Sequence, residues 1–460
     1  MKMIFNVEDK PKFGQLIVFA IQQLLAIMTA TLVVPVIIGN GMSSAAALFG
    51  AGIGTLVYIL FTKKKSPVFL GSSFAFIGSM FAAFAGGVSM SLGYLGLIIG
   101  AIFAGLVYVV IAIIVKIAGV KWIDKLMPPV VIGPTVAIIG LSLAKNAVGD
   151  ILKFAEFDAA NSVYVMGAKG WAGFICGMVT ILVVVLCSSY GKKMGKLIPF
   201  IFGILSGYIV AGIFTIIGYV ADIDVLKVID IAPFQALLTD GAVTINTFLA
   251  VPDFTFLTAY KGFGELNSTY IGTIAVAYIP VAFVVFAEHL ADHKNISSII
   301  EKDLLTEPGL HRTLLGDGIG SIVGAIFGGC PNTTYGESVG CVAITKNASV
   351  VTIMTAAILA VVISFVSPFI AFVNSIPACV MGGVCLALYG FIAVSGLKMV
   401  QSVDLNKNKN LFVASTILIA GIGGMALKIG QVTITSIACA LILGIIINLV
   451  VSKSDEQNAE

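Results

Sequence analysis

The stretch GGCPNTTYGESVG, residues 328–340, interrupts the apolar pattern of the chain and decides how its fold is interpreted. It places a carboxylate, Glu337, beside a proline, glycines and hydroxyl side chains. Threonine and tyrosine favour extended backbone, and Gly336 and Gly340 let other backbone approach closely. Extended backbone at membrane depth is tolerated only where protein or a polar ligand satisfies its N–H and C=O groups. We therefore expect a short strand here, followed by a helix whose N-terminal dipole points at a ligand.

The alternative for this stretch is an ordinary helix with a Gly/Pro kink, in which Glu337 makes a structural hydrogen bond. A charged side chain at mid-membrane costs about 3 kcal/mol or more, so it usually has a functional reason. Of the 23 acidic residues, only Glu288 and Glu337 are predicted to lie at membrane depth. The first of these ends a long apolar run, and the second lies in the interrupted segment quoted above.

The composition places the whole chain in a membrane. Of its 460 residues, 59% are hydrophobic and 11% are charged, and the mean hydropathy is +1.09. A soluble domain carries about 25% charged residues. The apolar runs are long rather than short and alternating, which favours helices over a β-barrel. The first run, residues 16–39, is too long for a signal peptide and is predicted to be the first span. The fold class predicted is an all-α polytopic membrane protein.

Runs long enough to cross a bilayer, about 20 residues each, predict fourteen transmembrane segments. A polar stretch, residues 222–268, separates seven spans from seven more, and we assign no chemistry to it. The third and tenth spans are short or interrupted by Gly, Ser, Thr and Pro. The predicted spans are 14–39, 43–62, 67–85, 91–118, 128–146, 171–188, 196–221, 269–290, 313–328, 332–345, 348–373, 376–397, 410–427 and 431–452.

The basic residues support an even number of spans. With both termini on the inner side, 20 of the 26 Lys and Arg residues fall on that side. Cytoplasmic loops carry an excess of Lys and Arg, so this bias predicts that both termini are cytoplasmic.

Two segment pairs indicate an inverted repeat. Residues 67–77, PVFLGSSFAFI, are similar to 330–339, CPNTTYGESV, at an offset of 261 residues. Residues 128–140 are similar to 377–390 at an offset of 249. Both pairs are seven spans apart, and because seven is odd, equivalent spans run in opposite directions. Inverted repeats are typical of alternating-access transporters. The alternative is that Gly-rich membrane segments look alike by composition.

These patterns divide the chain into three parts. The predicted domains are a first repeat, 1–221, a connecting extracytoplasmic segment, 222–268, and a second repeat, 269–460.

The depth of Glu288 is left open by the residues around it. Seventeen apolar or small residues, 271–287, precede it, so it could mark the cytoplasmic end of a helix. The helix could also continue through residues 296–300 and place Glu288 deeper.

The histidines do not predict a metal site. His289 and His293 are four residues apart, but their order, E-H-x-x-x-H, is not that of the H-E-x-x-H zinc motif. The seven cysteines lie mostly in apolar segments without metal or disulfide spacing. We therefore expect no metal and no cofactor.

Four motifs resemble those of the bacterial uracil permeases, in the nucleobase–ascorbate transporter family. They are SSFAFIG at 72–78, AEHLADH at 287–293, EPGLHR at 307–312 and PNTTYGESVGCVAITK at 331–346. The resemblance extends over nearly the whole chain. It implies fourteen spans in two inverted repeats, with short antiparallel strands in spans 3 and 10. It also implies a core of spans 1–4 and 8–11 that moves against a gate of spans 5–7 and 12–14.

The resemblance implies the residues that bind the base and couple its transport to protons. The proton-coupling candidates are Glu288, Asp292 and His293. The substrate-binding candidates are Glu288, Glu337, Phe74, Gly336, Tyr335 and Ser73.

Three positions depart from the family pattern. Gln23 replaces a first-span histidine, Asp292 replaces the histidine one turn after the span-8 acid, and Ser338 replaces an asparagine after the span-10 acid. The second departure leaves open whether Asp292 or the adjacent His293 shares the proton with Glu288.

The function expected is proton-coupled uracil uptake by alternating access across the bacterial cytoplasmic membrane. Uracil carries two N–H donors between carbonyl acceptors, so two carboxylates can accept both N–H groups. The expected partners are uracil, protons, membrane lipid and a second copy packed through the gate, with no nucleic acid and no enzymatic activity. The alternatives are a xanthine or other purine carrier, an anion carrier of the same fold, and a membrane metalloenzyme.

Overall fold

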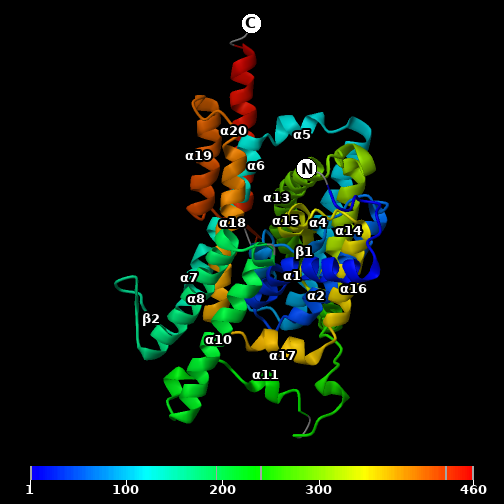
Figure 1. The fold of residues 1–460 in the computed structure, drawn as a ribbon. Helices are drawn as coiled ribbons and strands as arrows, with labels where there is room; N and C mark the ends of the chain where they lie inside the picture. Colours follow the sequence, from blue (N-terminus) through cyan, green and yellow to red (C-terminus); the bar gives the residue numbers. More distant parts are fainter. Residues whose placement is uncertain (1–2, 193, 239–240, 430–431, 458–460) are drawn as a thin grey trace.

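The computed structural model describes residues 3–192, 194–238, 241–429 and 432–457 as a bundle of helices (Figure 1). The helices of the first half are α1 (Phe13–Ile38), α2 (Ser44–Phe61), α3 (Ile77–Ala83), α4 (Met90–Ala118), α5 (Lys121–Leu126), α6 (Pro129–Ser142), α7 (Ala144–Ile151), α8 (Ala168–Tyr190), α9 (Met194–Leu197) and α10 (Pro199–Val220). Those of the second half are α11 (Ala232–Gln235), α12 (Thr255–Ala259), α13 (Ser268–Ile300), α14 (Leu310–Gly328), α15 (Gly336–Thr345), α16 (Val350–Ile363), α17 (Ser367–Ser375), α18 (Ala378–Val400), α19 (Asn408–Ile422) and α20 (Ser436–Gln457).

Six short strands form three antiparallel pairs among the described residues. The pairs are β1 (Leu70–Ser72) with β4 (Asn332–Thr334), β2 (Glu156–Asp158) with β3 (Val163–Val165), and β5 (Leu427–Ile429) with β6 (Val432–Ile434). Only the first pair joins segments far apart in the sequence.

The chain is a multi-pass membrane protein. Within the described residues, eight helices are long and apolar enough to cross a bilayer: α1, α2, α4, α6 together with α7, α8, α10, α13 and α18. Three shorter apolar segments lie in α16, α19 and α20. The end of α20 lies toward one end of the molecule, and α11 and α17 lie toward the other (Figure 1).

The structure corrects the eleventh predicted span, 348–373. Its helix, α16, ends at Ile363, and a separate short helix, α17, follows. Pro368 lies in the first turn of α17, where its missing N–H is tolerated, and it disfavours helical backbone in the residue before it. Backbone bonds from Ala250 to Phe365 (3.0 Å) and from Ser367 to Phe248 (3.0 Å) fasten this turn to the 222–268 segment.

The predicted strands in the third and tenth spans are confirmed. Strands β1 and β4 are buried and pair in the register Leu70↔Thr334, Gly71↔Thr333 and Ser72↔Asn332. The ladder extends beyond the strands, because Ser73 N donates to Pro331 O at 2.9 Å. The two interrupted segments thus satisfy each other's backbone groups at membrane depth, which any non-helical backbone requires there.

Glycines let α2 and α14 pack closely around this strand pair. A Cβ on Gly54 would lie 2.5 Å from Asn332 Nδ2 and 2.7 Å from the Gly320 carbonyl oxygen. A Cβ on Gly50 would lie 2.5 Å from the Gly324 carbonyl oxygen. Small residues four apart let membrane helices approach closely. The Asn332 side chain uses that approach to donate to Gly50 O at 3.1 Å, which ties β4 to α2.

Candidate functional site

A cavity of about 70 Å³ lies where the β1–β4 pair meets α13 and α18. It brings together the two carboxylates predicted at membrane depth, Glu288 and Glu337, and a third, Asp292. The remaining lining residues are Phe74, Val136, Ala291, Thr333, Tyr335, Gly336, Phe391, Ile392, Ser395 and Met399.

The chain direction at β4 places Glu337 at a helix N-terminus. Strand β4 ends at Thr334, Tyr335 caps α15 with extended backbone, and Glu337 follows in the first turn. The first N–H groups of a helix have no intrahelical partner, and its dipole is positive at this end. The cavity therefore has backbone donors beside a carboxylate, and the prediction of a strand leading into a helix at this stretch is confirmed.

Glu288 and Asp292 lie on one face of α13, one turn apart. The helix continues to Ile300, so Glu288 is well inside it rather than at its end. Thr334 Oγ1 donates to Asp292 Oδ2 at 2.8 Å, which joins β4 to α13. This bond holds β4, which leads to Glu337, against α13, which carries Glu288.

Two aromatic residues border the cavity. The buried Phe74 ring packs edge-on against Tyr389 of α18, with ring centroids 5.8 Å apart and an interplanar angle of 76°. Tyr335 Oη donates to the Ser72 carbonyl oxygen at 2.7 Å, so this hydroxyl stabilises the strand pair. A side chain on Gly71 would overlap the Tyr335 ring, which explains the glycine at this strand position.

Ser73 does not line the cavity, unlike its neighbour Phe74. Strand β1 ends at Ser72, and the chain bends at Phe74. Thr333, which the sequence reasoning missed, does line the cavity. Its hydroxyl is buried and has no hydrogen-bond partner among the described residues.

His293 lies in a buried network outside the cavity. Its Nε2 is 2.8 Å from Tyr58 Oη, and its Nδ1 is 2.8 Å from the His289 carbonyl oxygen. The two imidazole rings stack with centroids 4.0 Å apart. His289 in turn contacts Asp317 Oδ2 through Nδ1 at 2.7 Å and Thr313 Oγ1 through Nε2 at 3.0 Å.

Asp317 corrects the prediction that only two acidic residues lie at membrane depth. It is fully buried in α14, within the predicted ninth span. A single aspartate inside an apolar run, in the segment LLGDGIG, is the sequence feature that could have identified it.

Two of the positions that depart from the family pattern are in contact. Gln23 Nε2 of α1 donates a hydrogen bond to Ser338 Oγ of α15. Ser338 Oγ also accepts from Phe69 N at 3.0 Å. The glutamine and the serine thus connect α1, the approach to β1 and the helix that carries Glu337.

A helical membrane bundle with an acidic cavity at two interrupted segments defines a membrane transporter. The chain belongs to the permease family, whose model matches residues 14–430. This confirms the resemblance seen in the sequence and makes the chain a transporter rather than an enzyme.

The chain is similar to curated permeases over nearly its whole length. It is 37% identical to a uracil permease of Bacillus caldolyticus, covering 98% of this chain and 95% of that one. It is 36% identical to a uracil permease of Bacillus subtilis, covering 100% and 98%. It is 35% identical to a uracil permease of Escherichia coli K12, covering 97% and 93%.

Solved structures share the fold at low sequence identity. The transmembrane domain of the cyanobacterial bicarbonate transporter BicA has a TM-score of 0.62 at 15% identity, covering 96% of this chain and 99% of that one. The murine anion transporter Slc26a9 has a TM-score of 0.63 at 11% identity, covering 97% and 70%.

Proposed function

We propose that this protein takes up uracil together with protons across the cytoplasmic membrane of a bacterium. The observation that carries the proposal is the cavity in which Glu288 and Glu337 meet, in a chain whose relatives are named uracil permeases. The two carboxylates would accept the two N–H groups of the base. Backbone N–H groups in the first turn of α15, at Gly336 and beyond, would donate to its carbonyl oxygens. Phe74 would cover the ring.

An anion carrier is less compatible with this cavity, although the solved structures that share the fold are those of a bicarbonate transporter and an anion transporter. Three carboxylates line the cavity and would repel an anionic substrate. A xanthine carrier is the nearer competitor, because a purine also presents N–H and carbonyl groups. The names of the relatives favour the pyrimidine.

The transport mechanism proposed is alternating access by two inverted seven-span repeats. The helix contacts support this, because several of the main contacts in one half have a counterpart in the other. Helix α4 packs on α14 as α16 packs on α2, and α8 packs on α18 as α19 packs on α6. Helices α2 and α14 pair with each other, as do α6 and α18.

The strand register supports the same repeat. Gly71 pairs with Thr333. The residues related to these two by the 261-residue offset are Asn332 and Ser72, and they also pair with each other. A two-fold axis through the strand pair produces this relation.

The proposed domains follow from these repeats: 1–221, 222–268 and 269–460, with a core of spans 1–4 and 8–11 and a gate of spans 5–7 and 12–14. The cavity lies between the two groups, since α13 and α15 line it from the core and α6 and α18 from the gate. Movement of the gate past the core would open the cavity to one side and then to the other.

We infer that Asp292, rather than His293, shares the coupling proton with Glu288. The two carboxyl groups line one cavity, and they lie one turn apart on α13. His293 faces α2 instead: its Nε2 contacts Tyr58 of α2, and its Nδ1 contacts the His289 carbonyl oxygen of its own helix.

The remaining proposals concern the cell. Both termini would be cytoplasmic, which the distribution of the basic residues supports. A second copy would pack through the gate, as the family resemblance implies.

Uptake of radiolabelled uracil into proteoliposomes tests the proposal. An imposed inward proton gradient should drive accumulation that a protonophore abolishes and unlabelled xanthine leaves unchanged. Glu288→Gln should lose the gradient-driven accumulation, whereas Glu156→Gln, on the exposed β2 strand, should keep it. Transport of xanthine in place of uracil would overturn the substrate, and full proton-driven uptake by Glu288→Gln would overturn its role.

A further inference from the structure

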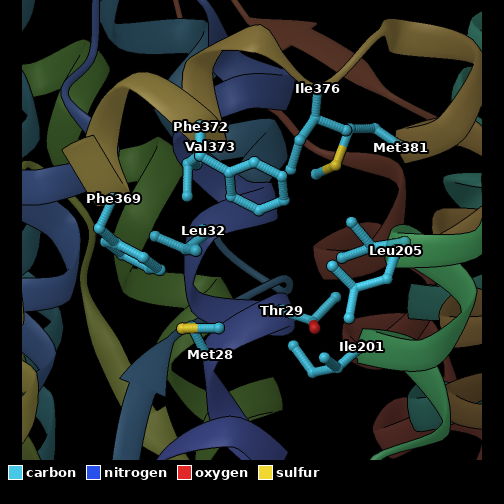
Figure 2. Close-up of a pocket in the computed structure, with 11 residues that line it drawn as sticks. Met28, Thr29, Leu32, Ile201, Leu205, Phe369, Phe372, Val373, Ile376 and Met381 are labelled. Atoms are coloured by element: carbon cyan, nitrogen blue, oxygen red, sulfur yellow. The ribbon is translucent and has the colours of Figure 1, made fainter. Parts of the chain in front are cut away.

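A second cavity, of about 170 Å³, lies between α1 on one side and α10, α17 and α18 on the other. Figure 2 shows the α1 side chains Met28 and Leu32 facing Ile201 and Leu205 of α10, with Phe372 of α17 covering them. This second cavity shares no lining residue with the acidic cavity, the one that Glu288, Asp292 and Glu337 line. It therefore lies where the proposed core and gate meet, but away from the proposed uracil site.

The chemistry of this second cavity excludes the base, water and ions. Among its lining residues only Thr29 has a polar side chain, and its hydroxyl is buried without a hydrogen-bond partner in the described chain. An apolar protein cavity of about 150 Å³ stays dry and takes up hydrocarbon instead. The occupant must therefore present a hydrocarbon surface.

The bilayer supplies such an occupant directly. Leu205 lines the cavity and begins a row of exposed apolar side chains along one face of α10, continued by Ile209, Ile213 and Ile216. A helix face of this kind in a membrane protein contacts lipid tails. The cavity is thus continuous with a surface that acyl chains cover.

A polar cleft adjoins the apolar cavity at Ile376, which lines both. This cleft, of about 460 Å³, is bordered by Lys169, Lys227 and Asp230. Lys227 Nζ is 2.6 Å from Asp224 Oδ1. Lys169 Nζ lies 5.1 Å from the centroid of the Phe154 ring. An apolar cavity that ends at ammonium and carboxylate groups matches the two parts of a phospholipid.

We propose that the cavity and the cleft together bind one phospholipid molecule. Its acyl chain fills the space between α1 and α10, and its phosphate lies at Lys169 and Lys227. Asp230 favours a head group that also carries an ammonium, such as phosphatidylethanolamine. A chain in this position fills the interface between α1 and the α10–α17–α18 group, so it stabilises the conformation seen here. This inference does not depend on the identity of the transported substrate.

Native mass spectrometry of the purified, delipidated protein tests the inference. The protein is titrated with phosphatidylethanolamine, with a linear alkane as the chain alone, and with phosphoethanolamine as the head group alone. We expect one phosphatidylethanolamine per chain and weaker binding of either part. If the alkane binds as tightly as phosphatidylethanolamine, the role of the cleft is overturned. If phosphoethanolamine binds as tightly as phosphatidylethanolamine, the role of the cavity is overturned.

Matched variants locate the bound lipid. Ile204→Trp should fill the cavity and abolish binding, because Ile204 lines it and is 7% exposed. Ile209→Trp, five residues along α10 and 62% exposed, is the control and should bind as the wild type does. Lys169 lies outside the hydrophobic core, so Lys169→Ala tests the site even if Ile204→Trp fails to fold. It should weaken lipid binding about fivefold. Unchanged binding in Lys169→Ala, or in a folded Ile204→Trp protein, would refute the site.

Discussion

Thr334→Val should weaken uracil binding by loosening the position of the two carboxylates. The Thr334 hydroxyl makes a 2.8 Å bond to Asp292 Oδ2, and valine removes this donor while keeping a branched side chain of similar size. The bond holds β4, which leads into Glu337, against α13, which carries Glu288. We therefore expect that, when this bond is lost, Glu288 and Glu337 are no longer held in the relative position that the base requires.

The size of the effect follows from the bond. A hydrogen bond to a charged group contributes about 1.5–3 kcal/mol, which corresponds to about 10- to 150-fold in affinity if the whole bond is needed in the bound state. Equilibrium binding of radiolabelled uracil to detergent-purified protein measures it. Thr345→Val is the control, because that hydroxyl bonds the Cys341 carbonyl of its own helix, at 2.7 Å. Wild-type affinity in Thr334→Val would refute the claim that this bond sets the spacing of the carboxylates.

Three further variants test the scaffold. Gly54→Ala should lower the free energy of unfolding by about 1–3 kcal/mol, since its Cβ would meet Asn332 Nδ2 at 2.5 Å, whereas Gly272→Ala, with nothing within 4 Å, should melt as the wild type does. Tyr335→Phe should lower the free energy of unfolding by about 1–3 kcal/mol, because the buried Ser72 carbonyl loses its donor. An unchanged melting temperature would argue against this hydrogen bond. The hydrogen bond and charge of Lys65 lower the pKa of Glu307, so the stability they contribute is present above the ordinary glutamate pKa and is lost as the pH falls through the lowered value. Across that acidic range the melting temperature should change less with pH for Glu307→Gln than for the wild type. The same pH dependence in both proteins would contradict the ion pair.

Local sequence chemistry was sufficient to predict the interrupted segments. Proline, paired hydroxyl residues, an aromatic residue and glycine disfavour a continuous helix wherever they occur together, so the strands at 70–72 and 332–334 could be expected from the residues alone. Their partnership was also predictable, because each needs a partner for its backbone and the two segments resemble each other.

Residues whose position depends on a neighbouring helix could not be placed in this way. The depth of Glu288 depends on where α13 ends, and the helix continues because His289 and His293 are buried against α14 and α2. Glu288 and Asp292 are four residues apart and share a face, whereas His293 is one residue further and points elsewhere. Ser73 was a substrate-binding candidate, yet it follows the last residue of β1 and does not line the cavity. The depth of Asp317 was indicated by the apolar run around it, but its contact with His289 of another helix was not.

Equilibrium binding of uracil to the purified protein and to its Glu337→Gln variant tests the central claim most directly. The claim is that the carboxylates of the acidic cavity hold the base. It predicts one bound uracil per wild-type chain and an affinity at least about tenfold lower in Glu337→Gln, where a charge-assisted bond is lost. Glu156→Gln should bind as the wild type does. Equal affinity in wild type and Glu337→Gln, or no uracil binding to the wild type, would contradict the claim.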